Sequence, residues 1–263
     1  MGWLKERRRA RIRRSGLPEA WRRIVKRSVP YVRLLPPADR AELEGKILVF
    51  LAEKRFEGTA GLAISDQIRL TIAAQACILL LHRRTDYYPG LYSIVVYPRS
   101  YVAHQVERDE SGIVTEGPQP RLGESWKEGA VVLSWADVKR DAAEPGTGHN
   151  VVFHEFAHQL DAEAGRPDGA PLLPDPTMYR TWSKTFEEGY AQLQRELASG
   201  REPPLDPYAA LNPAEFFAVA TETFFEKPRE LRRRMPGLHE QLRAYYNQDP
   251  AAFVPESSEP TNR

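Results

Sequence analysis

The segment from Val151 to Asp161 reads Val-Val-Phe-His-Glu-Phe-Ala-His-Gln-Leu-Asp, a His-Glu-x-x-His motif within a run that has helical periodicity and no glycine or proline. On an α-helix, residues four apart lie about 40° apart around the axis and about one turn apart along it. His154 and His158 would therefore share one face, where two imidazoles can bind one zinc ion. Glu155 lies about 100° further round, in the general-base position beside a water on that ion. The motif thus supplies two ligands and one base.

The residues around the motif distinguish a metal site from a chance occurrence. With six histidines in 263 residues, the pattern arises by chance about 0.01 times per chain, so a purely structural helix is the alternative. Asp161 follows His158 by three residues and is able to orient an imidazole from behind. The other neighbours are uncharged and can bury the helix: Val151, Val152, Phe153, Phe156, Ala157 and Leu160. These flanks favour the metal site.

Composition limits the class of protein. The chain has 263 residues, of which 41% are hydrophobic, enough for one large domain with its own core. The single cysteine, Cys77, excludes a disulfide framework and a cysteine-based zinc site, and it favours a reducing compartment. The longest apolar run has about ten residues and is interrupted by Gln75, whereas a bilayer-spanning helix needs ~20. We therefore expect a cytoplasmic protein with no membrane partner.

Charge divides the chain into three expected parts. Residues 1–33 hold twelve Lys or Arg against two Glu, although the net charge of the whole chain is only +1. This basic N-terminal arm could contact an anionic partner. It has no recognised nucleic-acid motif, so we expect no nucleic-acid partner and predict a solvated or partly disordered terminus. Residues 34–254 form the expected catalytic domain, and residues 255–263 the expected disordered tail.

Hydrophobic periodicity predicts a mainly helical α+β fold with a small mixed sheet. Helices are expected over residues 37–56, 67–83, 151–161, 178–197, 212–225 and 236–246. Strands are expected within residues 87–106, around Ile113 and Val114, and over residues 130–135. The last strand comes just before the motif helix, and it is the candidate edge for pairing with an extended peptide.

A catalytic zinc ion normally has three protein ligands, so a third ligand must come from outside the motif. The metzincin pattern would require glycine at position 161 and histidine at position 164, where this chain has Asp161 and Ala164. His149 and His239 could coordinate a metal, but neither lies on a predicted helix whose apolar face must be buried beside the motif. We expect His149 to be an incidental loop residue.

Two glutamates on one later helix remain as candidates. Glu215 is the first acidic residue of a helix with five apolar positions, and it follows His158 by 57 residues. Glu222 lies seven residues further on, hence on the same face, and is the rival ligand. Glu222 could instead brace a histidine, and Glu215 could instead be an exposed carboxylate favoured by the helix dipole. We prefer Glu215 as the third ligand.

Three segments together resemble a known family: His154-Glu-Phe-Ala-His158 with Asp161, Pro207-Tyr208, and Asn212-Pro-Ala-Glu215-Phe-Phe-Ala218. They are similar to the Mlc titration factor A family of zinc-dependent peptidases, whose catalytic fold is similar to the protease domain of anthrax lethal factor. The resemblance covers about residues 10–250. It implies a zincin-like, gluzincin-type site with one Zn²⁺ per chain on His154, His158 and Glu215, and a functional tyrosine at Tyr208.

The motif and the resemblance predict a zinc-dependent peptidase, of aminopeptidase type, acting on peptide substrates. Glu155 would be the general base, and Tyr208, otherwise an ordinary loop tyrosine, would donate a hydrogen bond to the oxyanion. The alternative is a regulatory protein that binds and inactivates a transcriptional repressor of sugar uptake, as the named member of the family does with Mlc. Peptidase activity would then be secondary.

Overall fold

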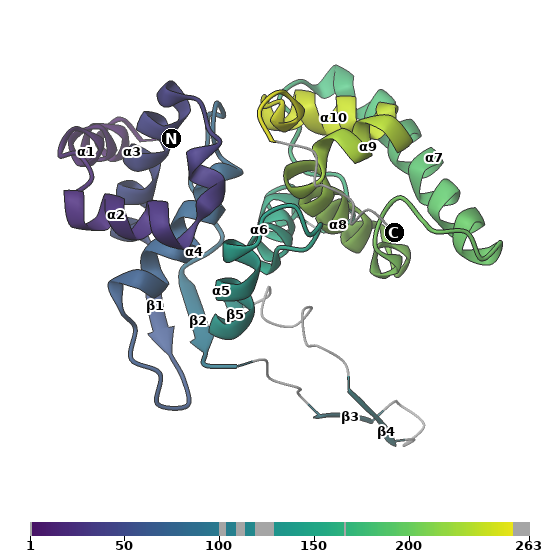
Figure 1. Ribbon diagram of the computed structural model, residues 1–263, viewed down its shortest axis with the longest axis horizontal. Helices are drawn as coiled ribbons and strands as arrows, with labels where there is room; N and C mark the ends of the chain where they lie inside the picture. Colours follow the sequence, from purple (N-terminus) through teal and green to yellow (C-terminus); the bar gives the residue numbers. More distant parts are fainter. Residues whose placement is uncertain (1, 100–103, 109–113, 119–128, 166, 255–263) are drawn as a thin grey trace, which may run out of the picture.

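The computed structural model describes residues 2–99, 104–108, 114–118, 129–165 and 167–254, and helices dominate it (Figure 1). The N-terminal helices are α1 (Trp3–Arg14), α2 (Glu19–Ser28), α3 (Pro37–Glu53) and α4 (Asp66–Ile78). The central and C-terminal helices are α5 (Trp135–Ala143), α6 (Val151–Ala162), α7 (Tyr179–Ala198), α8 (Pro213–Glu226), α9 (Pro228–Arg234) and α10 (Pro236–Tyr246). Short 3₁₀ turns include η1 (Pro30–Arg33), η3 (Pro176–Met178), η4 (Pro207–Ala210) and η5 (Pro250–Ala252).

The described strands form two small sheets. Strands β1 (Arg55–Gly58), β2 (Ser93–Tyr97) and β5 (Ala130–Ser134) are parallel in the order β1-β2-β5. Strands β3 (His104–Arg108) and β4 (Val114–Pro118) pair separately and antiparallel. The predicted mainly helical α+β class is confirmed, but the three-stranded sheet is parallel, not mixed, because the antiparallel pair stands apart from it. Within the described residues, β5 lies at an edge of the parallel sheet, as expected.

The structure differs from the sequence expectation in where α3 ends and in the number of helices. Helical periodicity predicted that α3 continues to residue 56, but residues 55–58 form β1. Phe56 pairs with Ile94 of β2, and this pairing gives residues 55–58 an extended conformation. After the N-terminal arm, helices α5 and α9 were not expected. Helix α5 is capped by Ser134, whose hydroxyl accepts a hydrogen bond from the Asp137 backbone N–H at 3.3 Å. This Ser-x-x-Asp signal is a helix start that the neighbouring strand pattern concealed.

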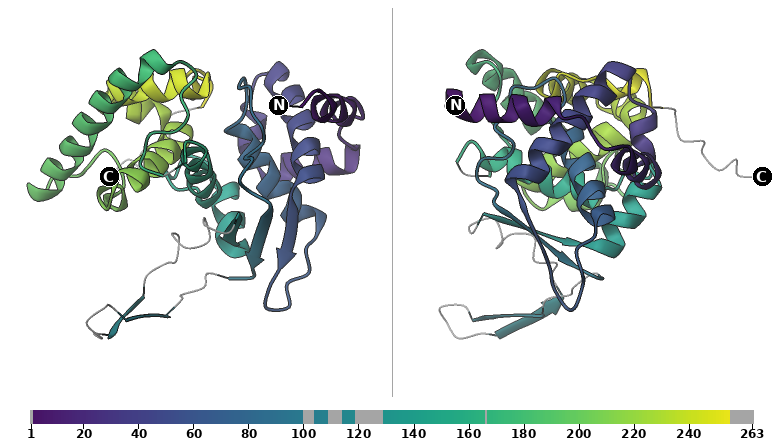
Figure 2. Two further views of the ribbon diagram at one scale, coloured as in Figure 1. Left: turned by 180° about the vertical axis from the view of Figure 1, so that it is seen from behind. Right: turned by 90° about the vertical axis from the view of Figure 1, so that its left-hand side faces the viewer.

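Helix α6 lies at the centre of the molecule. Figures 1 and 2 show α1–α4 and the parallel sheet on one side of it, and α7–α10 on the other. Its aromatic residues pack in both directions: Phe156 contacts Phe50 of α3, with ring centroids 5.8 Å apart, and Phe153 contacts Phe225 of α8 at 5.2 Å. Because α6 is buried on both sides, the residues from Val151 to Leu160 that surround the His-Glu-x-x-His motif are uncharged.

Helix α4 is the main buried helix of the N-terminal half. Ser65 caps it by accepting a hydrogen bond from the Ile68 N–H, and every residue from Leu70 to Ile78 is buried. Cys77 is fully enclosed in this stretch. None of the helices in the described part of the chain combines the length and apolar character needed to cross a lipid bilayer.

The basic N-terminal arm differs from the solvated terminus that its composition suggested. Residues 3–14 form α1, which packs on α3 through Arg9, a fully buried side chain. The Arg9 guanidinium forms a two-point ion pair with Glu53, with both N–O distances 2.7 Å, and contacts Asp86 at 2.8 Å. It also lies 4.6 Å above the Tyr87 ring. Composition cannot reveal these partners, which are distant in sequence.

We expect Arg9→Ala to lower the free energy of unfolding by about 2 kcal/mol, because the partly buried Glu53 carboxylate loses both of its hydrogen bonds from the guanidinium, whereas Asp86 keeps its ion pair with Lys5. The cost should be below that of a fully buried pair, since the Glu53 and Asp86 side chains retain 15% and 31% exposure. Urea unfolding followed by circular dichroism measures the change. The exposed Arg8→Ala is the control, with an expected change of no more than about 0.5 kcal/mol. Equal changes in Arg9→Ala and Arg8→Ala would show that the ion pairs of Arg9 do not stabilise the packing of α1 on α3.

Candidate functional site

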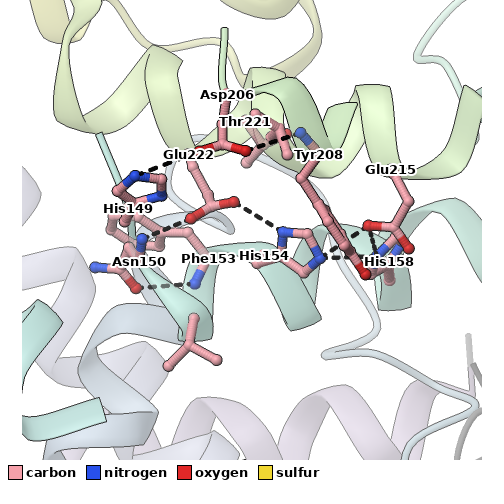
Figure 3. Close-up of polar contacts among 12 residues, drawn as sticks. His149, Asn150, Phe153, His154, His158, Asp206, Tyr208, Glu215, Thr221 and Glu222 are labelled. Carbon is pink, nitrogen blue, oxygen red and sulfur yellow. Dashed lines mark hydrogen bonds and ion pairs between the residues drawn. The ribbon is translucent and has the colours of Figure 1, made fainter. Parts of the chain in front are cut away.

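Helix α6 is fixed at its start by a cap. The Asn150 side chain accepts a hydrogen bond from the Phe153 N–H at 3.0 Å, and the Val151 N–H donates to Asp141 at 3.0 Å. Both bonds satisfy N–H groups that the first turn of a helix leaves without a partner. The cap fixes where the helix begins, so His154 and His158 both face α8 (Figure 3).

Helix α8 brings the third candidate ligand from a distant part of the chain. Asn212 caps it by accepting a hydrogen bond from the Glu215 N–H at 3.0 Å, and Pro213 occupies the first turn. The residues from Phe216 to Glu226 are all buried. Since this apolar helix packs against α6, Glu215 is carried to the motif face.

His154, His158 and Glu215 converge on one point. The Glu215 Oε2 atom lies 3.1 Å from His154 Nε2 and 3.4 Å from His158 Nε2, and the two Nε2 atoms are 3.2 Å apart (Figure 3). One ligand atom from each of the three residues lies within 4.8 Å of the others. The structure therefore brings together the three residues that the sequence proposed as metal ligands.

The chemistry of this cluster fits a metal ion. His154 Nδ1 lies 2.8 Å from the Glu222 carboxylate, so we assign its proton to Nδ1, which leaves an Nε2 lone pair facing the cluster. Lone pairs from two imidazoles and a carboxylate repel one another unless a cation lies between them. Burial alone would lower the pKa of His154, yet Glu215 and Glu222 raise it well above its usual value. Burial and His154 lower the pKa of His158 well below its usual value, so the His158 imidazole stays neutral and can serve as a metal ligand.

Glu222, the rival ligand, binds the other side of His154. Its Oε1 atom accepts from His154 Nδ1 and its Oε2 atom accepts from the Asn150 N–H at 2.6 Å. One carboxylate thereby holds both the imidazole and the start of α6. This is the bracing arrangement in which an outer carboxylate orients a metal-binding histidine.

A buried polar network continues behind Glu222, and sequence reasoning did not identify it. The Asn150 side-chain amide donates to Gln75 Oε1 at 2.8 Å and to Glu226 Oε1 at 3.2 Å, and the Gly146 N–H donates to Glu226 Oε2 at 2.5 Å. Burial raises the pKa of Glu226 to about 7. The available signals were a glutamine within the apolar α4 and a glutamate one turn after Glu222 on the phenylalanine-rich α8.

Glu155 is buried beside the cluster. Its side chain lines the cleft, and its Oε1 atom has no hydrogen-bond partner among the described residues. Burial raises the pKa of the Glu155 carboxyl to about 8; His154 opposes this shift, and Glu215 and Glu222 add to it. A carboxylate held without a partner in such surroundings is a typical proton acceptor at an active site.

Tyr208 lies on η4, with its ring centroid 6.0 Å from that of His154. Figure 3 shows its side chain descending from η4 toward the point where the histidines and Glu215 meet. Burial, together with the carboxylates of Glu215 and Glu155, raises the pKa of the Tyr208 phenol to about 12. The phenol therefore stays protonated near neutral pH and can donate a hydrogen bond into the cleft.

A cleft of about 480 Å³ adjoins the cluster at His154, whereas His158 and Glu215 are not among its lining residues. Its walls come from the end of α5, the loop before α6, the first turns of α6, the η4 turn and α8. The lining residues are Arg140, Asp141, His149, Asn150, Val151, His154, Glu155, Asp206, Tyr208, Val219 and Glu222. His149, expected to be incidental, is thus on the cleft wall, with its side chain 61% exposed.

Two other sequence candidates lie outside the cluster. Asp161 does not orient an imidazole; its Oδ2 atom accepts a hydrogen bond from the Gly169 N–H at 2.8 Å and holds the loop after α6. His239 is buried in α10, with its ring centroid 5.4 Å from that of Phe224. Neither contributes an atom to the convergent group.

A helix that carries His-Glu-x-x-His, completed by a carboxylate from a second helix, defines a metallopeptidase with a zincin-like site. Comparison with known families agrees with this class. The chain belongs to the family of glucose-regulated metallopeptidases M90, whose model matches residues 3–247. The family membership expected from the sequence is confirmed.

Relatives match over most of their length. An uncharacterised protein from Synechocystis is 41% identical over 249 residues, covering 94% of this chain and 90% of the relative. Mlc titration factor A from Klebsiella pneumoniae is 31% identical over 233 residues, covering 88% and 87%. The protein of that name from Escherichia coli is 30% identical over 226 residues, covering 85% and 84%.

Proposed function

We propose that the protein is a zinc-dependent peptidase in which Glu155 is the general base. The observation that carries this proposal is a buried glutamate that follows directly after the first histidine of the convergent cluster and lines one cleft with it, its Oε1 atom without a hydrogen-bond partner among the described residues. His154, His158 and Glu215 would hold the metal. Two imidazole nitrogens and one carboxylate oxygen form a donor set suited to a catalytic zinc ion.

When bound, zinc would supply Lewis-acid polarisation of the scissile carbonyl and of water. Glu155 accepts the proton of the attacking water at its carboxylate and passes it to the leaving amine. Its raised pKa brings its proton affinity toward neutral pH, where both steps are feasible. Tyr208 donates its phenolic proton in a hydrogen bond to the carbonyl oxygen as negative charge develops there.

The substrate of this proposal is a peptide, and the type of action is aminopeptidase. Strand β5, at an edge of the parallel sheet, leads through α5 to the wall of the cleft. An extended peptide could pair its backbone with that edge and reach the cluster.

Purified protein tests this proposal directly. We expect about one zinc per chain, and hydrolysis of aminoacyl and short peptide chromogenic substrates that a chelator abolishes and added zinc restores. Acetylation of the substrate amino group should greatly reduce cleavage if the action is of aminopeptidase type. Zinc binding without cleavage of any free or blocked peptide would exclude the peptidase proposal.

A second candidate function follows from the names of the relatives. Several are called Mlc titration factor A, so binding and inactivation of a transcriptional repressor of sugar uptake is the alternative, with peptidase activity secondary. A repressor partner would place the protein in the cytoplasm. Co-purification with an Mlc-like repressor, unaffected by loss of zinc, would favour this second function.

Tyr208→Phe should lower kcat about 10²–10³-fold on a well-cleaved substrate, because it removes one hydrogen-bond donor to the oxyanion. Zinc content and thermal stability should hardly change, since the ring and its packing remain. A tyrosine that only shaped the substrate pocket would change KM more than kcat. Steady-state kinetics separates the two, and a wild-type kcat would exclude the oxyanion role.

A further inference from the structure

Tyr208 is held by a short turn and not by a long helix. Backbone hydrogen bonds flank this turn at both ends: the Ala209 N–H donates to Asp206 O at 3.0 Å, and the Leu211 N–H donates to Tyr208 O at 3.2 Å. The Tyr190 hydroxyl fixes its end by donating to Ala210 O at 2.7 Å. Because the turn is only four residues long, the position of the phenol depends on each contact at the start of the turn.

Asp206 provides the contact at the start. Its Oδ1 atom accepts a hydrogen bond from the Tyr208 backbone N–H at 2.8 Å, and it is the cap of η4. A side-chain cap of this kind changes the population of a short turn by about two- to thirtyfold. The bond acts on the backbone of the same residue whose phenol points into the cleft.

The second carboxylate oxygen of Asp206 faces the opposite wall. Its Oδ2 atom lies 3.6 Å from His149 Nε2, an ion-pair distance and longer than a hydrogen bond (Figure 3). The His149 backbone is itself fixed, because its N–H donates to Thr147 Oγ1 at 3.2 Å and the Thr147 hydroxyl donates to His149 O at 3.1 Å. Asp206 therefore joins the η4 turn to the loop before α6.

We propose that Asp206 is a positioning residue that holds Tyr208 over the metal cluster, and that His149 supports Asp206 from the other wall of the cleft. This inference rests on the peptidase function proposed above. It assigns a role to His149, which the sequence left as an incidental loop residue. Neither side chain contributes a ligand atom to the convergent group.

The chain contains a matched control for this role. Asp175-Pro176-Thr177 repeats the arrangement of Asp206-Pro207-Tyr208: Asp175 Oδ1 accepts from the Thr177 N–H at 2.8 Å and caps the 3₁₀ turn η3. Asp175 is not among the residues that line the cleft. Asp175→Ala therefore removes the same cap in a turn that carries no cleft residue.

The kinetic test compares these variants in zinc-loaded protein. Asp206→Ala should lower kcat about tenfold with a much smaller change in KM, whereas Asp175→Ala should leave kcat unchanged. Asp206→Asn, which keeps an acceptor oxygen for the Tyr208 N–H, should recover most of the rate. His149→Ala should lower kcat by a smaller factor, and it should have no further effect when combined with Asp206→Ala.

A double-mutant cycle identifies the route through Tyr208. If Asp206 acts by placing the phenol, Asp206→Ala should cost little when Tyr208 is already phenylalanine. An equal fold-loss in both backgrounds would overturn the proposal and make Asp206 a direct substrate contact. Equal losses in Asp206→Ala and Asp175→Ala would also overturn it, because they would show a general stability effect.

Hydrogen exchange gives a readout that does not require peptidase activity. Asp206→Ala should accelerate amide exchange in peptides covering residues 203–211 about tenfold, and Asp206→Asn should not. Unchanged exchange in Asp206→Ala would refute the positioning role. If exchange responds as expected but wild-type protein cleaves no peptide, the proposed function fails while the structural role of Asp206 stands.

Discussion

Glu155→Gln is expected to abolish nearly all hydrolysis while leaving the metal and the fold in place. Removal of a general base costs about 10²–10⁴-fold in rate, and here the same carboxylate serves in both proton transfers. The metal should remain, because Glu155 contributes no atom to the convergent group of His154, His158 and Glu215. The amide of glutamine has nearly the same size and shape as the carboxyl group it replaces, so the substitution should cost little stability.

Three measurements on one preparation decide this prediction: zinc per chain, thermal stability and kcat. Glu144→Gln, the same change at an exposed position in the loop after α5, is the control and should behave as wild type. Substantial turnover by Glu155→Gln would show that another group removes the proton. Loss of zinc in Glu155→Gln would mean that its carboxylate contributes to metal binding.

Glu215→Ala is expected to reduce zinc content to nearly none and to abolish activity. It removes one of three ligand atoms, so the loss of affinity should exceed the ~10–100-fold cost of removing an outer partner. Glu222→Ala is the matched comparison, since it removes the same carboxylate two turns along the same helix. It should retain zinc at saturating metal but bind it about 10–100-fold more weakly.

Competition with a chromogenic chelator measures both affinities. Full zinc binding by Glu215→Ala with loss in Glu222→Ala would reverse the assignment and make Glu222 the ligand. Circular dichroism should accompany both measurements, because Glu222 also accepts a hydrogen bond from the Asn150 N–H and its removal could loosen the start of α6.

The motif half of the site could be predicted from the sequence because its geometry is local. Four residues of one helix fix the relation of His154 to His158 whatever surrounds them. Glu215 and Glu222 are different, since seven residues return to nearly the same face and periodicity cannot separate them. What separates them is their position along α8. The Glu215 carboxylate reaches the Nε2 atoms of both histidines, whereas the Glu222 carboxylate reaches His154 Nδ1.

The outer parts of the site depend on contacts that periodicity does not encode. Asp161 follows His158 at a spacing suited to orienting its imidazole, yet the Asp161 carboxylate instead accepts a hydrogen bond from the Gly169 N–H in the loop after α6. Gln75 reaches Asn150 from a helix 75 residues earlier. Arg9 is buried for the same reason, because Glu53 and Asp86 come from distant segments. In each case a polar residue acquires its role from a partner that only the fold supplies.

The enclosure of Cys77 gives this protein an internal reporter of conformational opening. The chain has no other cysteine, and burial of this thiol within α4 raises its pKa, so thiolate forms only when the core opens. The rate of alkylation by a small reagent therefore tracks the exposure of α4. If an inactive variant is alkylated at Cys77 as slowly as wild type, its fold is intact and only the catalytic step is impaired. If Cys77 is alkylated quickly, the substitution has destabilised the fold around α4.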